Sequence, residues 1–165
     1  MVYVHTVNPG TPGSYSELVW ATYLSGVWTT AVVPGATGAI EPAFAFDAGG
    51  HAHAFYIESS QTTIGHATNA SGSWVTETIG SVSAGFITDW PAIAIDKGTG
   101  RVHVIFVGQG LQYVRQDPGG AWVPLTIDPN VVGGSPSIAV DGIGMIHVAY
   151  YDRTNKRLKI ASGTP

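Results

Sequence analysis

The chain has 165 residues, which is enough for one domain with a hydrophobic core. Its formal net charge is −4 and only 11% of its residues are charged, so it lacks the clustered Lys and Arg of nucleic-acid-binding proteins. It has no cysteine, which excludes disulfides and cysteine-ligated zinc, and no apolar run of about 18 residues that could cross a membrane. The 22 glycines favour short strands and tight turns over helices.

Strand patterns recur along the chain in sets of four. The first set has three members, at 5–7, at 18–21 and from Trp28 onward. Two full sets follow, at 42–47, 53–56, 64–67 and from Trp74, and at 91–96, 103–106, 111–114 and from Trp122. The last set again has three members, at 136–141, 147–150 and 158–161. The period is about 47 residues, which is typical of the blades of a β-propeller.

The same residue types occupy the same places in each set. The repeated residues are His5, His53, His103, His147, Asp47, Asp96, Asp141, Trp28, Trp74 and Trp122. We expect the aspartates to cap the turn after the first strand, the histidines to bond a turn or a backbone group, and the tryptophans to pack between blades. Equivalent residues of different blades lie far apart, so we predict no catalytic residue, metal site or cofactor from them.

These patterns predict an all-β chain, 1–165, built as one β-propeller domain of about 3.5 blades. The blades are expected at about 1–33, 42–80, 91–128 and 136–164. The first lacks its first strand and the last lacks its fourth, so an open arc would expose two hydrophobic faces. We therefore expect a homodimer that closes a ring of seven or eight blades. A four-bladed ring within one chain and an excerpt of a longer propeller are the alternatives.

The pattern Pro-x-Ile-Ala-x-Asp, Gly-x-x-His-Val-x-Tyr, Leu-x-x-Ala and Gly-x-Trp covers nearly the whole chain. It resembles bacterial propeller repeats of the broad sialidase-like (BNR-type) and lectin-like superfamily. Residues 71–74 and 118–122 keep the Gly and Trp of the sialidase Asp-box but not its Asp. The resemblance implies that catalysis would use an arginine triad, a tyrosine nucleophile and an acid. The four arginines occupy no common repeat position: Arg101, Arg115, Arg153 and Arg157.

Trp90 is a candidate ligand-binding residue because it breaks the repeat. It precedes Pro91, at a position where the other sets have Glu41 and Ser135, and Asp89 stands beside it. An aromatic ring next to a carboxylate can stack on a sugar and hydrogen-bond to it. We therefore predict a ligand site at Asp89, Trp90 and Glu41, with a gap-filling or interface role for Trp90 as the alternative.

Two metal sites are weaker alternatives. His51 and His66 lie outside the repeat and, together with His53, could supply imidazole ligands. Residues 96–100 resemble a calcium loop but lack its further carboxylates.

The predicted function is a non-enzymatic binding or scaffold module that binds carbohydrate and associates with itself, with no nucleic-acid or membrane partner. One alternative is a fragment of a sugar-active propeller enzyme, a glycoside hydrolase or lyase. Another is a designed, truncated or reconstructed propeller without native activity. The low charge and the many Ser, Thr and Gly residues are typical of secreted bacterial proteins, although the first residues lack the pattern of a signal peptide.

Overall fold

The computed structural model describes the whole chain except residues 60–61, 82–89, 118, 132 and 165. The described residues form fourteen β-strands in four antiparallel sheets. This confirms the predicted all-β fold. No helix in the described part of the chain is long and apolar enough to cross a membrane.

The sheets follow one another in chain order, and neighbouring strands within each sheet are consecutive in sequence. The first sheet contains β1 (Val2–Val7), β2 (Tyr15–Leu24) and β3 (Val27–Thr37). The second contains β4 (Ala39–Phe46), β5 (Ala52–Glu58), β6 (Thr63–Thr68) and β7 (Val75–Ser81). The third contains β8 (Ala92–Ile95), β9 (Val102–Gly108), β10 (Gly110–Gln116) and β11 (Trp122–Asp128). The fourth contains β12 (Ser137–Val140), β13 (Ile146–Asp152) and β14 (Arg157–Gly163).

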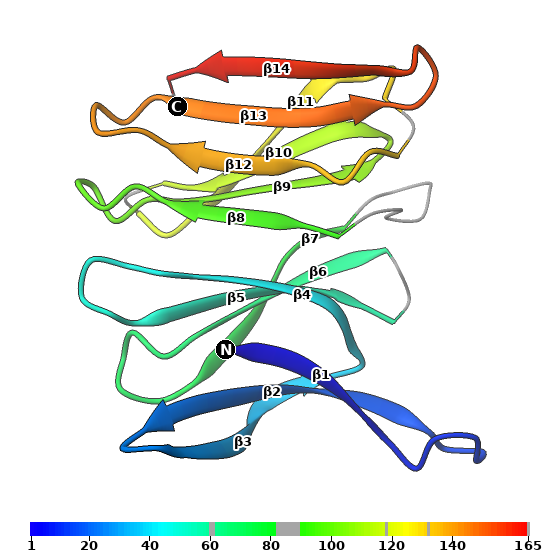
Figure 1. Cartoon of the computed structure of the whole chain (residues 1–165), viewed down its shortest axis with the longest axis vertical. Coiled ribbons are helices and arrows are strands. Elements are labelled where there is room, and N and C mark those ends of the chain that lie inside the picture. The colour runs from blue at the N-terminus through cyan, green and yellow to red at the C-terminus, as the bar shows by residue number, and fades with distance from the viewer. Residues whose placement is uncertain (60–61, 82–89, 118, 132, 165) are drawn as a thin grey trace.

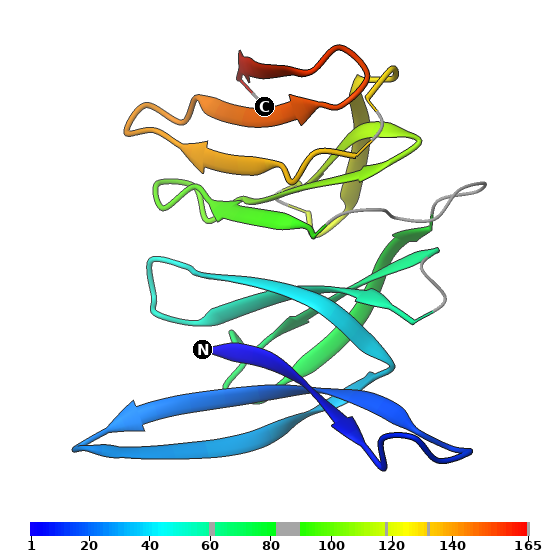
Figure 2. The same cartoon turned by 45° about the vertical axis from the view of Figure 1, so that its right-hand side comes forward.

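The first strands of the four sheets lie side by side. β4 packs against β1 and β8, and β8 also packs against β12. Figure 1 shows these strands toward the viewer, with the first sheet at the bottom and the fourth at the top. In Figure 2 the last strands of the second and third sheets run at a steep angle behind them, as the twist of sheets requires. The first and fourth sheets lie at opposite ends of this stack, so the described chain does not close on itself.

A repeated aspartate holds the turn between the first two strands in the second, third and fourth sheets. Asp47, Asp96 and Asp141 each accept hydrogen bonds from backbone N–H groups of the following turn, at 2.8 to 3.0 Å. The pKa of Asp141 lies below its usual value because His147 and these backbone groups stabilise the carboxylate. The three aspartates therefore cap the turn after the first strand, as their sequence pattern predicts.

The hydrophobic core consists of three layers, one between each pair of successive sheets. Leu18 is buried between the first and second sheets, Phe55 between the second and third, and Ile105 between the third and fourth. Alternate residues of each strand point into opposite layers, because side chains alternate across a sheet. A sheet inside the stack therefore contributes to two layers, whereas the first and fourth sheets contribute to one.

The repeated tryptophans do not share one environment. Trp74 packs edge-on against Trp20 of the preceding sheet, with ring centroids 5.6 Å apart, and Trp122 packs against Phe55 at 5.4 Å. Trp28, the equivalent residue of the first sheet, is 57% exposed. The packing between blades expected for Trp28 is therefore wrong for the single chain, because no described sheet precedes the first one.

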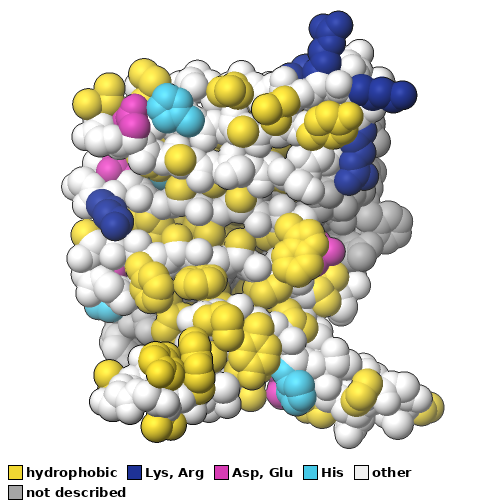
Figure 3. All heavy atoms as spheres, viewed as in Figure 1, with side chains coloured by type: hydrophobic (Ala, Val, Ile, Leu, Met, Phe, Trp, Pro, Cys, Tyr) yellow, Lys and Arg dark blue, Asp and Glu magenta, His cyan; other side chains and the backbone are white. Residues whose placement is uncertain are grey.

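Apolar and charged side chains separate along the stack. On the face shown in Figure 3, hydrophobic side chains gather over the lower sheets, and Lys and Arg side chains gather near the upper right. Four of the seven basic residues belong to the segment 153–159, which comprises the β13–β14 turn and the first residues of β14. The fourth sheet thus carries most of the positive charge of the chain at one of its ends.

Candidate functional site

Trp90 and Ser135 come two residues before β8 and β12, and Glu41 is the third residue of β4, so all three belong to the end at which these strands begin. The three strands run in one direction (Figure 1). We call this end of the sheets the loop end. Trp90 is 59% exposed and Glu41 is half-buried. The backbone is left-handed at Glu41 (φ 49°) and Ser135 (φ 37°), a costly conformation that is often found at functional sites. Asp89, the third predicted ligand-binding residue, lies outside the described residues.

A small hollow of about 220 Å³ lies beside Ser135. Tyr151 and Arg153 contribute to its wall, together with Gly134. The backbone N–H of Tyr151 donates a hydrogen bond to the carbonyl of Gly134 at 3.1 Å. A Cβ at Gly134 would collide with the Tyr151 carbonyl, and the φ of 139° also favours glycine there. The hollow is thus lined by a backbone segment that requires glycine, by a tyrosine and by an arginine.

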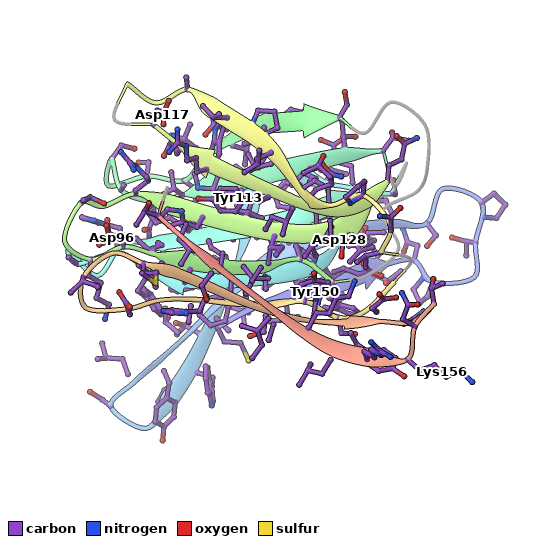
Figure 4. All side chains as sticks on the ribbon, turned by 90° about the horizontal axis from the view of Figure 1, so that it is seen from above. Asp96, Tyr113, Asp117, Asp128, Tyr150 and Lys156 are labelled. Atoms are coloured by element: carbon purple, nitrogen blue, oxygen red, sulfur yellow. The ribbon has the colours of Figure 1, made fainter. Side chains whose placement is uncertain are left out.

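An ion-pair network lies at the loop end of the fourth sheet. The Lys159 ammonium donates to Asp128 at 2.9 Å and to Asp152 at 2.8 Å, and the Tyr150 hydroxyl donates to Asp128 at 3.1 Å. The Asn155 side chain donates to Asp152 at 2.8 Å. Hydrogen bonds from Asn155 and Lys159 hold the pKa of Asp152 well below its usual range. Figure 4 shows Asp128 and Tyr150 at this end, and Asp96 and Asp117 at the other.

The network predicts a specific stability effect at Lys159. Replacing Lys159 with Met should lower the free energy of unfolding by about 2 kcal/mol, because it leaves the unexposed Asp152 carboxylate without its cation. Urea unfolding measures this difference. Lys97→Met is the matched control, since Lys97 is exposed, and it should change stability by less than about 0.5 kcal/mol. Equal effects of the two substitutions would contradict a stabilising role for the network.

His53 and His66 form a buried hydrogen-bonded chain. Their rings meet at 3.1 Å (Nδ1 to Nε2), and His66 Nδ1 lies 2.9 Å from a carboxylate oxygen of Glu77. Asp47 lies 3.7 Å from His53 on the other side. Burial lowers the pKa of both histidines, so the rings are neutral near pH 7. The geometry fits a His66 ring that donates to Glu77 and accepts from His53.

His51 joins this chain from its exposed side and does not converge with His53 and His66. Its Nδ1 lies 2.9 Å from Asp47. Burial alone would raise the pKa of Asp47, but the hydrogen bonds from His51 lower it below its usual value. Outside the gaps in the described chain, no group of three or more His, Cys, Asp or Glu side chains could hold a metal ion.

Of the other repeated histidines, His147 reaches the turn as predicted, whereas His103 bonds a side chain of the neighbouring strand instead. His103 Nδ1 lies 2.7 Å from the Tyr113 hydroxyl. His147 lies 3.1 Å from Asp141, the aspartate of its own turn. His5 lies 3.9 Å from a glutamate of β2. The partner of each ring thus lies in the same sheet as the histidine, and the structure does not bring these histidines together.

A cleft of about 500 Å³ opens between the third and fourth sheets. Tyr113 and Leu125 lie on one side and Val148 on the other. His66 in β6 and Tyr113 in β10 occupy equivalent positions of the second and third sheets. At the interface between these two sheets, Trp122 of β11 packs edge-on against His66. The fourth sheet has only three described strands, and no described tryptophan covers Tyr113. The cleft is mainly apolar and suits an extended apolar segment better than a sugar.

Three residues of the loop end are not predicted from the sequence: Asp128, Arg153 and Lys159. Asp152 and Asn155 stand three positions apart and bond as an Asx-type turn, a local signal that could have identified this hairpin. Asp128 and Lys159 are 31 positions apart and meet only because two sheets pack together. No short-range pattern connects them.

Comparison with known proteins gives matches in structure only, since neither a protein-family model nor a curated protein sequence matches the chain. The Hadza microbial sialidase Hz136 has a TM-score of 0.54 at 15% identity, over 76% of this chain and 34% of its own. The intramolecular trans-sialidase from Ruminococcus gnavus has a TM-score of 0.53 at 12% identity, over 98% of this chain and 40% of its own. A fucose lectin from Kordia zhangzhouensis has a TM-score of 0.49 at 15% identity, over 74% of this chain and 91% of its own.

The two sialidase matches concern the fold alone, because identities this low carry no information about the site. The chain spans 34% and 40% of the length of these two proteins. They confirm the sialidase-like resemblance drawn from the repeat, and the chain shares its fold with part of these sialidases.

Proposed function

We propose that the chain is a non-enzymatic carbohydrate-binding module whose four sheets are blades of a β-propeller. The period of about 47 residues, the consecutive strand order within each sheet and the adjacent first strands are typical of propeller blades. The fold shared with sialidases supports the same arrangement. The blades then correspond to about 1–33, 42–80, 91–128 and 136–164.

The exposed Trp90 ring carries the proposal for sugar binding. Its 59% exposure places an indole in water at the loop end. The strained backbones of Glu41, within β4, and of Ser135, just before β12, belong to the same end. An indole face can stack on the C–H face of a sugar ring, while the Glu41 carboxylate can accept hydrogen bonds from hydroxyl groups. Asp89, adjacent in sequence, would add a second carboxylate.

The placement of the arginines favours binding without bond cleavage. Arg101 lies at the β8–β9 turn, whereas Arg153 and Arg157 flank the β13–β14 turn at the loop end. The triad implied by the sialidase resemblance would require three arginines at one point.

A glycan array followed by calorimetric titration with the best-bound sugar tests this proposal. We expect Trp90→Ala to weaken binding at least tenfold, or about 1.4 kcal/mol, because the stacking face is lost. Tyr15→Ala is the matched control, since it removes an exposed aromatic ring from the first sheet, and it should retain affinity. Sugar binding that is equally strong in Trp90→Ala would place the site elsewhere.

A second candidate is that the chain belongs to a larger sugar-active enzyme. The fractions of 34% and 40% of the sialidase lengths support this alternative. Release of free sugar from a glycan substrate, measured as new reducing ends, would favour the enzyme over the binding module.

A further inference from the structure

The three repeated tryptophans occupy one register position. The residue three positions after each tryptophan pairs with a residue in the middle of the neighbouring strand, which we call the central residue. The central residues are Trp20 for Trp28, His66 for Trp74 and Tyr113 for Trp122. Side chains an odd number of positions apart point to opposite faces of a sheet. Each tryptophan therefore points toward the preceding sheet, and each central residue points toward the following one.

Within the chain this register produces the same contact twice. Trp74 lies edge-on against Trp20, with centroids 5.6 Å apart and planes at 63°. Trp122 lies edge-on against His66 at 5.2 Å and 72°. A tryptophan of the later sheet thus packs on the central residue of the earlier sheet at both interfaces.

The first sheet has the tryptophan of this contact, but no described sheet provides a central residue for it to pack on. Trp28 is 57% exposed and touches Tyr23 of its own sheet, at 5.1 Å between centroids. Tyr23 and Val32 share its outward face and are also exposed. A face of this kind is unfavourable in water unless a partner covers it.

The fourth sheet has the central residue of this contact, but no described tryptophan packs on it. Ile160 occupies in β14 the position that Trp20 and His66 occupy in β2 and β6, and it is 72% exposed. Leu158 lies on the same outward face, and both are apolar. Lys159 points to the opposite face and is bound to carboxylates there, so it adds no charge to the outward face.

We propose that the fourth sheet of one copy packs on the first sheet of a second copy, with Trp28 of one seated on Ile160 of the other. This arrangement repeats between chains the contact that the chain already makes twice within itself. Two copies joined in this way at both ends form a closed ring of eight sheets, four from each chain. The proposal does not depend on sugar binding, because Trp90 lies outside this interface.

Light scattering of the whole chain tests the proposal. We expect a mass of twice 17.2 kDa for the unsubstituted protein at micromolar concentration, and 17.2 kDa for Trp28→Asp and for Ile160→Asp. Ile143→Asp is the control, since Ile143 is 84% exposed but lies in the β12–β13 turn, and it should keep the double mass. Circular dichroism checks that all variants stay folded. A single-chain mass for the unsubstituted protein would overturn the proposal.

A mixing experiment distinguishes this head-to-tail contact from a face-to-face dimer. Trp28→Asp keeps an intact Ile160 and Ile160→Asp keeps an intact Trp28, so a mixture of the two retains one unaltered interface. We expect the mixture to form a species of double mass that neither variant forms alone. If only Trp28→Asp abolished association, the first sheets would pack on each other and the proposal would be wrong.

Discussion

Lowering the pH from 7 to 4 is expected to reduce the free energy of unfolding by about 2 kcal/mol through His103 alone. His103 has no exposed surface, and its Nε2 has no hydrogen-bond partner among the described residues. Its Nδ1 meets the Tyr113 hydroxyl at 2.7 Å. Burial, reinforced by the positive charge of Arg101, lowers the pKa of His103 to about 4.

The sign follows from proton binding in the two states. A histidine in the unfolded chain has a pKa of about 6.5, so between pH 6.5 and 4 the unfolded chain binds a proton that folded His103 does not. The contribution of His103 to stability therefore decreases as the pH falls through this window and is fully present above it. Asp96 favours the protonated ring, and Arg115 opposes it. Burial also lowers the pKa of His53 and His66, which adds to the loss.

Urea unfolding at several pH values measures this effect. The unfolded chain binds up to one more proton than the folded protein because of His103, and His103→Gln should remove this difference. The free energy of unfolding should then depend less steeply on pH. Val104→Ala is the control, because it removes buried volume at the neighbouring position without a titratable group. It should lower stability by a similar amount at each pH. An unchanged pH dependence in His103→Gln would show that the ring is protonated in the folded protein.

The sheets could be predicted from the sequence because their determinants are local and repeated. Asp141 caps its turn through groups within four residues, so the pattern of Asp followed by glycines specifies the contact directly. Strand alternation and the recurring histidines locate the second strands in the same way. Repetition supplies the same local evidence several times, which makes the strand assignment secure.

The contacts between side chains of neighbouring strands could not be predicted, because they depend on register. His66 faces Glu77 only because the pairing of β6 with β7 shifts between Ile64 and Gly65. A slip of one residue would send the Glu77 side chain to the other face of the sheet. The sequence contains no sign of this shift, so the His53–His66–Glu77 chain emerges only in the structure.

Trp28 shows a different limit of repeat-based prediction. Its sequence pattern is that of Trp74 and Trp122, and the structure gives it the same register relative to the neighbouring strand. Burial, however, requires a preceding sheet, and the single chain supplies none. Repetition therefore predicts what a residue faces only where the next repeat is present.

Replacing Phe55 with Ala is expected to lower the free energy of unfolding by about 3–5 kcal/mol. Phe55 has no exposed surface, stacks on His66 at 4.6 Å and meets the edge of Trp122 at 5.4 Å. The substitution removes both aromatic contacts and leaves a cavity between the second and third sheets. Urea unfolding at pH 7 measures the loss, at a pH where the lowered pKa of His66 keeps this ring neutral in the parent protein.

Phe44→Ala provides the matched comparison for Phe55→Ala. Phe44 is the same residue type on the adjacent strand β4 but is partly exposed, so its removal should cost no more than about 1 kcal/mol. The difference between the two substitutions isolates the packing between sheets. Equal losses would mean that the second and third sheets do not share a packed layer. The contact of Trp122 with His66 would then be a poor basis for the contact proposed between Trp28 and Ile160 of two copies.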